Sequence, residues 1–312
     1  MMKPAAEILV RMARDSGVSV ISEFGLYILA RKLFADRGYA GIPIPPRNRN
    51  LTYRRARNLV SEATCDPEWQ DERRLPRDED FSSTLFTVAP AGTVSVMLAA
   101  DPFACLSHGS ALSFHGLAPE PPEVHLVTPE RAQWQQQANA IVESVMGWPF
   151  EEIEADELPF RPTRPVPHRD VRGRVVHRHE MRHPIVMEQR GELRAAAIGE
   201  TFRDALDKPD WCGGIEAVID VWRRHALKHL DAIIATVSAS SEKILRVRAG
   251  YLLEEVLGID DIRITAWAAD AQRGSSRKLD SAAPYASRFS ARWMLSINVA
   301  DSSLPSTTKP EA

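Results

Sequence analysis

The chain has 312 residues, of which 44% are hydrophobic and 26% are charged, and its net charge is −3. These fractions are those of a soluble globular protein and exclude a fibrous or wholly disordered chain. The length corresponds to about two domains of roughly 150 residues each. The longest stretch without a charge, Phe81 to Ala100, is interrupted by Pro90 and Gly92, so we expect no membrane helix there.

The cysteines and the amino terminus indicate the compartment. The three cysteines, Cys65, Cys105 and Cys212, lie far apart in sequence, which argues against a disulfide framework and a CxxC zinc site. The first residues lack the apolar segment and cleavage site of an export signal. No glycine-rich phosphate loop and no GxSxG spacing occurs. We therefore expect a cytoplasmic protein with no membrane partner and no cofactor.

Charge is distributed unevenly along the chain. Residues 1–60 contain eleven basic and four acidic residues, a net charge of +7, whereas the remaining residues carry 28 basic and 38 acidic groups. A basic segment on an acidic body favours contact with nucleic acid. The alternative is a basic surface that contacts only solvent.

The basic segment predicts three helices. Apolar residues at helical spacing predict a first helix over residues 5–14, and Ser22 is a plausible N-cap for a second helix that extends to about Arg37. A third helix over residues 47–63 places its apolar side chains on one face: Ala56, Leu59, Val60 and Ala63. A helix that rests on two preceding helices and presents polar residues outward is typical of a DNA-recognition helix.

The third helix contains the candidate DNA-binding residues. Its first part reads RNRNLTYRRAR and holds five arginines and no acid. Arginine can donate two hydrogen bonds to guanine, asparagine can pair with adenine, and flanking arginines can contact phosphates. We assign the site to Arg47, Arg49, Arg54, Arg55, Arg57 and Asn58. Arg54, Arg55 and Asn58 fall on the outward face of the helix, and Arg47, Arg49 and Arg57 would contact phosphates. The alternative is an arginine-rich face that contacts only solvent.

Residues 84–98 predict a hairpin, because strand-forming residues flank the turn residues Pro90 to Gly92. Three helices followed by a hairpin are the outline of a winged helix-turn-helix. We assign this DNA-binding domain to residues 1–100.

Residues 101–300 predict a second, mixed α/β domain, so the predicted fold class is α+β, and residues 301–312 predict a flexible tail. In chain order, the expected elements of this domain are a helix over 103–117, a strand over 123–128, a helix from 130 to 147, a proline-rich connection over 149–170, a strand over 174–186, a hairpin around Gly191, helices over 199–206, 213–222, 228–237 and 241–258, and two strands over 262–268 and 291–299.

Histidines in this second part admit two interpretations. His108 and His115 share a helix face, where a Ser–His nucleophile pair is conceivable but packing is the simpler interpretation. His177 and His179 lie two residues apart on a predicted strand and therefore on one side of it, as metal ligands would. No carboxylate or thiol completes a ligand set in the sequence, so we favour a solvated strand face.

Acidic pairs raise the possibility of a metal-dependent nuclease. Glu200 and Asp204 are one helical turn apart, and Asp207 and Asp210 follow. A nuclease needs carboxylates that converge on metal ions. Helix-surface acids and helix-ending residues explain these four more simply.

Four segments in the second part resemble the AbiEi family of antitoxins, the regulator halves of type IV, abortive-infection toxin–antitoxin pairs. The similar segments are LSHGSALSFHGL at 106–117, GETFRDALDKPDWCGGIEAV at 199–218, VRAGYLLEEVLG at 247–258 and RWMLSINV at 292–299. Phe202, Arg203 and residues 247–249 depart from the family pattern, and residues 129–170 form a divergent or inserted segment.

The resemblance implies an amino-terminal winged helix that binds operator DNA and represses its own operon. It also implies a carboxy-terminal domain that counteracts a nucleotidyltransferase-like toxin, with no catalytic residues to carry over. Operators of such proteins are often inverted repeats, so a homodimer or paired monomers on DNA are expected. A metal-dependent nuclease and a stand-alone regulator that senses a small ligand are the alternatives.

Overall fold

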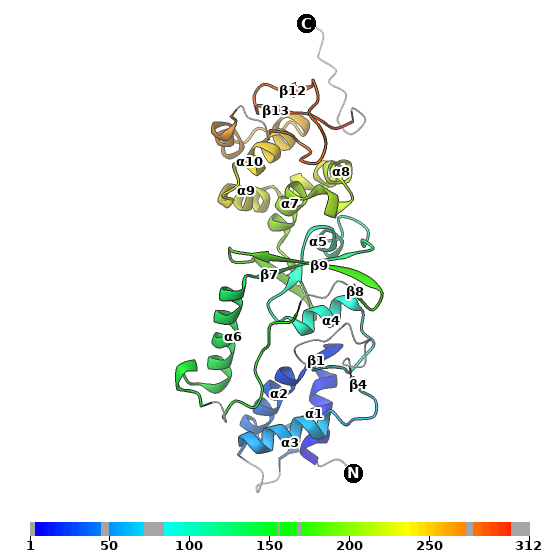
Figure 1. Ribbon diagram of the computed structural model, residues 1–312, viewed down its shortest axis with the longest axis vertical. Coiled ribbons are helices and arrows are strands. Elements are labelled where there is room, and N and C mark those ends of the chain that lie inside the picture. The colour runs from blue at the N-terminus through cyan, green and yellow to red at the C-terminus, as the bar shows by residue number, and fades with distance from the viewer. Residues whose placement is uncertain are drawn as a thin grey trace. The chain divides into compact units, whose positions relative to one another are not determined.

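The computed structural model describes residues 4–44, 50–71, 84–154, 157–166, 170–272 and 277–300 (Figure 1). Within these residues, no helix is both long enough and apolar enough to cross a membrane. The chain divides by its internal contacts into two compact units. Unit 1 comprises Met1–Cys105, Val127–Ile185 and Gln189–Arg194, and unit 2 comprises Leu106–Leu126, Val186–Glu188 and Ala195–Ala312.

Three helices of unit 1 pack on one another around an apolar core (blue and light blue in Figure 1). They are α1 (Pro4–Asp15), α2 (Glu23–Ala35) and α3 (Tyr53–Ala63). Their existence confirms the three predicted helices, although α3 begins at Tyr53. Ser22 is the N-cap of α2, because its hydroxyl accepts a hydrogen bond from the N–H of Gly25 at 3.0 Å.

A small antiparallel sheet accompanies these helices. Its strand order is β1-β5-β4, so the last strand in sequence lies in the middle. The strands are β1 (Val20–Ser22), β4 (Gln70–Asp71) and β5 (Leu85–Thr87), and a separate two-stranded pair consists of β2 (Gly38–Tyr39) and β3 (Ile42–Pro43).

The predicted hairpin over residues 84–98 is wrong in its second half. Residues after β5 form helix α4 (Thr93–Ala100), and β5 pairs with β1 and β4 instead. Val96, Met97 and Leu98 are all buried, so this helix has no polar face that would reveal a helical period in the sequence. Gly92 is the N-cap of this helix and not part of a hairpin turn.

The rest of unit 1 follows the prediction more closely. Helix α6 (Arg131–Met146) ends at Gly147, whose φ of 79° is the left-handed conformation of a helix end. The proline-rich connection contains one short 3₁₀ turn, Phe150–Glu152, among its described residues. It is followed by an antiparallel pair, β8 (Asp170–Val171) and β9 (Arg174–Met181).

A six-stranded mixed sheet has the order β10-β11-β6-β7-β9-β8. β11 and β6 run parallel with Ala195 opposite Leu106, whereas β8 and β9 are antiparallel. Together with the helices, this sheet confirms the α+β fold class. The strands not yet described are β6 (Cys105–Leu106), β7 (Val124–Pro129), β10 (Met187–Arg190) and β11 (Leu193–Ala196).

Unit 2 is built mainly from helices around one large apolar core. α7 packs against α5, α8, α9 and α10. The elements are α5 (His108–Phe114), α7 (Ile198–Asp207), α8 (Ile215–His225), α9 (Leu230–Ala239), α10 (Lys243–Gly250), a π-helical turn (Tyr251–Val256), α11 (Ile262–Ala266), β12 (Phe289–Ser290) and β13 (Leu295–Ser296).

Three predictions in this part need correction. The strand expected over residues 291–299 is reduced to β13, because residues 291–294 form a turn. The helix expected over residues 103–117 begins only at His108, because Cys105 and Leu106 belong to β6. The strand expected over residues 262–268 is wrong, since Asp261 caps helix α11 by accepting a hydrogen bond from the N–H of Arg263 at 2.8 Å. Ile262 is 79% exposed, so the apolar alternation there did not mark a buried strand face.

Candidate nucleic-acid interface

Helix α3 has two opposite faces. The apolar side chains predicted to anchor it are all buried: Ala56, Leu59, Val60 and Ala63. Leu59, Val60 and Ala63 belong to the core of helices α1 and α2. On the other side, Arg54, Arg57 and Asn58 are exposed. Arg54 and Asn58 were predicted on this face, whereas Arg57 was predicted to flank it. The helix is therefore held by its apolar stripe while its cationic stripe faces solvent.

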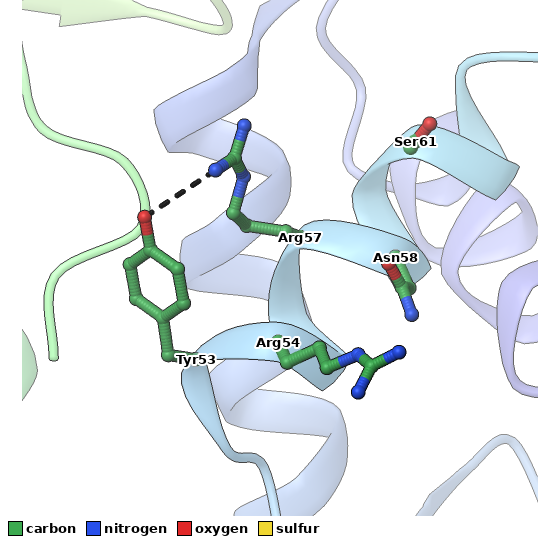
Figure 2. A pocket seen from close by; sticks show the side chains of 5 residues that line it. All are labelled: Tyr53, Arg54, Arg57, Asn58 and Ser61. Carbon is green, nitrogen blue, oxygen red and sulfur yellow. Dashed lines mark hydrogen bonds between the residues drawn. The ribbon is translucent and has the colours of Figure 1, made fainter. Parts of the chain in front are cut away.

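The exposed stripe borders a surface hollow of about 480 Å³, which we call the α3 hollow (Figure 2). Its lining residues all come from α3: Tyr53, Arg54, Arg57, Asn58 and Ser61. Three of the six predicted site residues thus lie together in one place. The other two lining residues, Tyr53 and Ser61, were not among the predicted site residues.

Arg57 is held by Tyr53. Its Nη1 donates to the Tyr53 hydroxyl at 3.4 Å, and its guanidinium carbon lies 5.8 Å from the centroid of that ring (Figure 2). The four-residue spacing places the two side chains on neighbouring turns. The four-residue spacing between Tyr53 and Arg57 is the sequence signal by which Tyr53 could have been included in the predicted site.

The remaining predicted arginines behave differently. Arg55 is half-buried, and its Nη1 donates to the backbone carbonyl of Asn50 at 2.6 Å, so it is not among the residues that line the α3 hollow. Arg47 and Arg49 lie outside the described residues. Arg54 and Asn58 form no hydrogen bond or ion pair with any residue that the structure describes.

His108 and His115 have packing roles. His108 is 7% exposed, its Nδ1 lies 2.9 Å from the Ser107 hydroxyl, and its ring meets Trp211 edge-on at 4.7 Å. Burial, reinforced by the positive charges of His125, Arg203 and Lys208, lowers the pKa of His108 to about 3. His115 Nε2 lies 2.9 Å from the carbonyl oxygen of Ala196. This arrangement keeps His108 neutral within the core.

The neutral, buried His108 should make stability depend on pH. Between about pH 6.5 and 3, the unfolded chain binds a proton at this residue and the folded chain does not, so stability falls as pH decreases through that window. From pH 7 to pH 5 the loss should be about 2 kcal/mol. Urea unfolding at several pH values measures it.

His108→Asn is the matched variant for this measurement. Asparagine tolerates the φ of 48° at position 108 and does not titrate, so the pH-dependent loss should shrink by about the same 2 kcal/mol. An unchanged pH profile in the variant would show that other groups cause the dependence.

Glu200 and Asp204 do not form an open metal site. Arg203 lies between them and forms ion pairs with both carboxylates, at 2.7 Å in the case of Asp204, and all three side chains are largely buried. The guanidinium neutralises charge that a nuclease would direct at metal ions. Asp207 is the last residue of α7, and Asp210 lies in the following 3₁₀ turn. The structure therefore gives the nuclease alternative no support from these acids.

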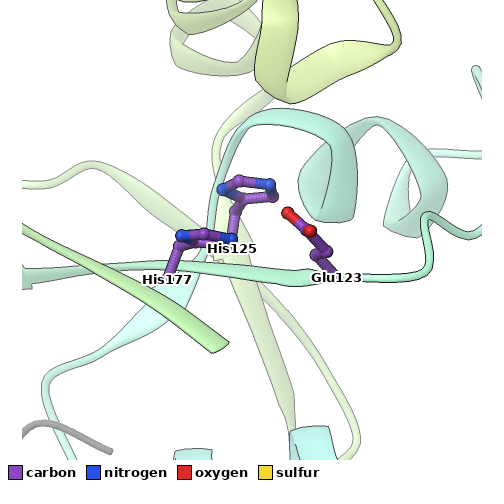
Figure 3. Close-up of side chains that lie close together, drawn as sticks. All are labelled: Glu123, His125 and His177. Carbon is purple, nitrogen blue, oxygen red and sulfur yellow. The ribbon is translucent and has the colours of Figure 1, made fainter. Parts of the chain in front are cut away.

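The histidine pair on β9 lies on one side of the strand, since the rings of His177 and His179 are parallel and 6.5 Å apart. The sequence pattern alone showed no carboxylate to complete a ligand set and did not point to His125. Figure 3 draws His177 together with Glu123, which directly precedes β7, and His125, which lies on β7. In the sequence, Glu123 and His125 are two residues apart, the spacing of side chains on one side of a strand.

Comparisons with known proteins add little to this geometry. No protein-family model matches the sequence, and no curated protein matches it. The chain is similar to one solved structure, that of the RV2827C protein from Mycobacterium tuberculosis, with 13% sequence identity and a TM-score of 0.42. That likeness covers 95% of this chain and 92% of the other.

Proposed function

We propose that this protein is a DNA-binding repressor and that α3 is its recognition helix. The observation that carries the proposal is the pair of opposite stripes on α3, one buried in the core of α1 and α2 and the other exposed and cationic. A helix fixed in this way can enter the major groove, where arginine and asparagine side chains reach base edges. No acidic residue occurs in the first turn to repel phosphates.

The order of elements in residues 4–87 supports a winged helix-turn-helix. The elements follow one another in the order α1, β1, α2, the strand pair β2 and β3, α3, β4 and β5. Strands β1, β4 and β5 form the antiparallel sheet β1-β5-β4. In this arrangement α2 and α3 are the two helices of the helix-turn-helix. Residues 72–83, between β4 and β5, lie outside the described residues.

The resemblance to AbiEi antitoxins extends the proposal to a biological role. The protein would bind inverted repeats upstream of its own operon as a dimer or as paired monomers in the cytoplasm. It would also counteract a nucleotidyltransferase-like toxin through residues 101–300. Coexpression with the adjacent reading frame, with and without residues 1–100, separates the antitoxin role from repression.

Binding to the protein's own upstream DNA tests the repressor role. The full-length protein should bind such a fragment with an affinity that falls steeply as salt rises, because arginine contacts release counterions from the duplex. The triple variant Arg54→Ala, Arg57→Ala, Asn58→Ala should bind at least about 100-fold more weakly, since each contact contributes roughly 1–3 kcal/mol. Gel shifts over a range of salt concentrations measure both effects.

Arg11→Ala is the matched control. Arg11 is an exposed arginine of α1 that pairs with Asp15 at 3.7 Å and is not part of the α3 hollow. Its loss should leave the affinity within about threefold of the parent, because screened surface pairs contribute little. Equal binding by the triple variant and the parent would refute the assignment of α3 as the recognition helix.

A further inference from the structure

We infer that the arginines of α3 divide their tasks: Arg54 and Asn58 read bases, and Arg57 contacts a phosphate. The operator half-site would then contain a guanine and an adenine one or two base pairs apart. This inference rests on the proposed function. It departs from the sequence-based assignment, in which Arg55 shared the base-reading face.

The angular positions of the side chains around α3 distinguish the centre of its exposed face from the two flanks of that face. At about 100° per residue, Arg54, Asn58 and Ser61 fall within about 60° of one another, and their centre lies about 180° from the buried stripe. Arg57 lies about 70° to one side of that centre, and Arg55 about 90° to the other side. Residues at the centre would point to the floor of the groove, whereas residues on the flanks face its phosphate walls.

The contacts of the side chains agree with this division. Arg57 is restrained at the flank by the hydroxyl and ring of Tyr53, and Arg55 donates to the carbonyl of Asn50. Arg54 and Asn58 have no such partner among the described residues, so their donors stay available for a base. A restrained guanidinium can still interact with a phosphate, because that interaction needs charge more than fork geometry.

Donor chemistry and spacing specify the bases. The arginine fork matches the two acceptors of guanine, N7 and O6, and an asparagine amide matches the N7 acceptor and N6 donor of adenine. Arg54 and Asn58 are four residues apart, about 6 Å along the helix. Since successive base pairs are about 3.4 Å apart, the two side chains reach positions separated by one or two steps. Arg54 lies in the first turn of α3, where recognition helices contact base edges.

The experiment is a selection of bound sequences from a randomised operator library with the full-length protein. It compares the parent with the variants Arg54→Lys, Asn58→Ala and Arg57→Ala. Arg54→Lys keeps the charge but loses the fork, so the preference for one guanine should fall by about tenfold to hundredfold while affinity for random DNA is retained. Asn58→Ala should remove the preference for the adenine alone. Arg57→Ala should weaken all sequences equally and reduce the salt slope by about one.

The outcomes distinguish the two proposals. If the parent protein binds no upstream fragment, the proposed function fails. If the parent binds but Arg54→Lys and Asn58→Ala leave every base preference unchanged, DNA binding stands and the division of tasks is wrong. A change in base preference in Arg57→Ala would likewise overturn the phosphate assignment. All three side chains are exposed, and thermal unfolding should show that each variant folds like the parent.

Discussion

Asp101→Ala should destabilise unit 1 by about 3–5 kcal/mol, because it leaves the buried Arg178 guanidinium without its anion. The two side chains form an ion pair at 3.0 Å and are 2% and 6% exposed, respectively. The Asp101 carboxylate also accepts hydrogen bonds from Thr128 at 2.8 Å, from the indole of Trp134 at 2.9 Å and from the N–H of Phe103 at 3.1 Å. Urea unfolding of the full-length protein measures the loss.

The size of this effect follows from burial. Burial lowers the pKa of Arg178, and the charge of Asp101 acts in the opposite direction and helps to keep the guanidinium protonated. Removing the carboxylate therefore leaves a buried charge without its partner and three further hydrogen-bond donors unsatisfied, and both effects lower the free energy of unfolding. Asp101→Asn should cost less than Asp101→Ala, since the amide oxygen still accepts hydrogen bonds.

An exposed ion pair in unit 1 provides the comparison. Asp15 pairs with Arg11 at 3.7 Å, and both side chains are about half exposed. Asp15→Ala should cost less than about 1 kcal/mol. Similar losses for Asp15→Ala and Asp101→Ala would show that Asp101 does not hold the elements around it together.

Local sequence signals were sufficient to predict the amino-terminal helices and the buried and exposed faces of α3. A cap such as Ser22 and an apolar stripe such as Ala56 to Ala63 act within a few residues, so the sequence displays them directly. Helix α4 was missed because most of its residues are buried and its sequence shows no clear helical period. Helix α11 was missed because the capping role of Asp261 outweighed an apolar alternation that suggested a strand.

Local sequence signals were also insufficient to predict the candidate interface in full. The sequence identified Arg54, Arg57 and Asn58 but not which arginines are restrained, since this depends on the side chains of Tyr53 and the backbone of Asn50. The strand order of the six-stranded sheet was not predicted for a related reason. Which strands lie beside one another in a mixed sheet is a property of the fold, and local sequence patterns do not encode it.

Gly250→Ala should destabilise unit 2 by about 3 kcal/mol or more, although alanine is the better helix former by about 1 kcal/mol. Gly250 ends α10, and a methyl group there would lie only 2.1 Å from Cη2 of Trp293 and 2.3 Å from Cζ3. Trp293 is fully buried in the core, where close packing restricts its movement. Thermal or urea unfolding measures the change.

A double substitution separates steric conflict from any other effect of the new methyl group. The atoms nearest to Gly250 all belong to the six-membered ring of Trp293, and leucine lacks them. Trp293→Leu alone should destabilise through a cavity, but adding Gly250→Ala to it should cost at least about 2 kcal/mol less than adding it to the parent. Additive losses would refute the contact.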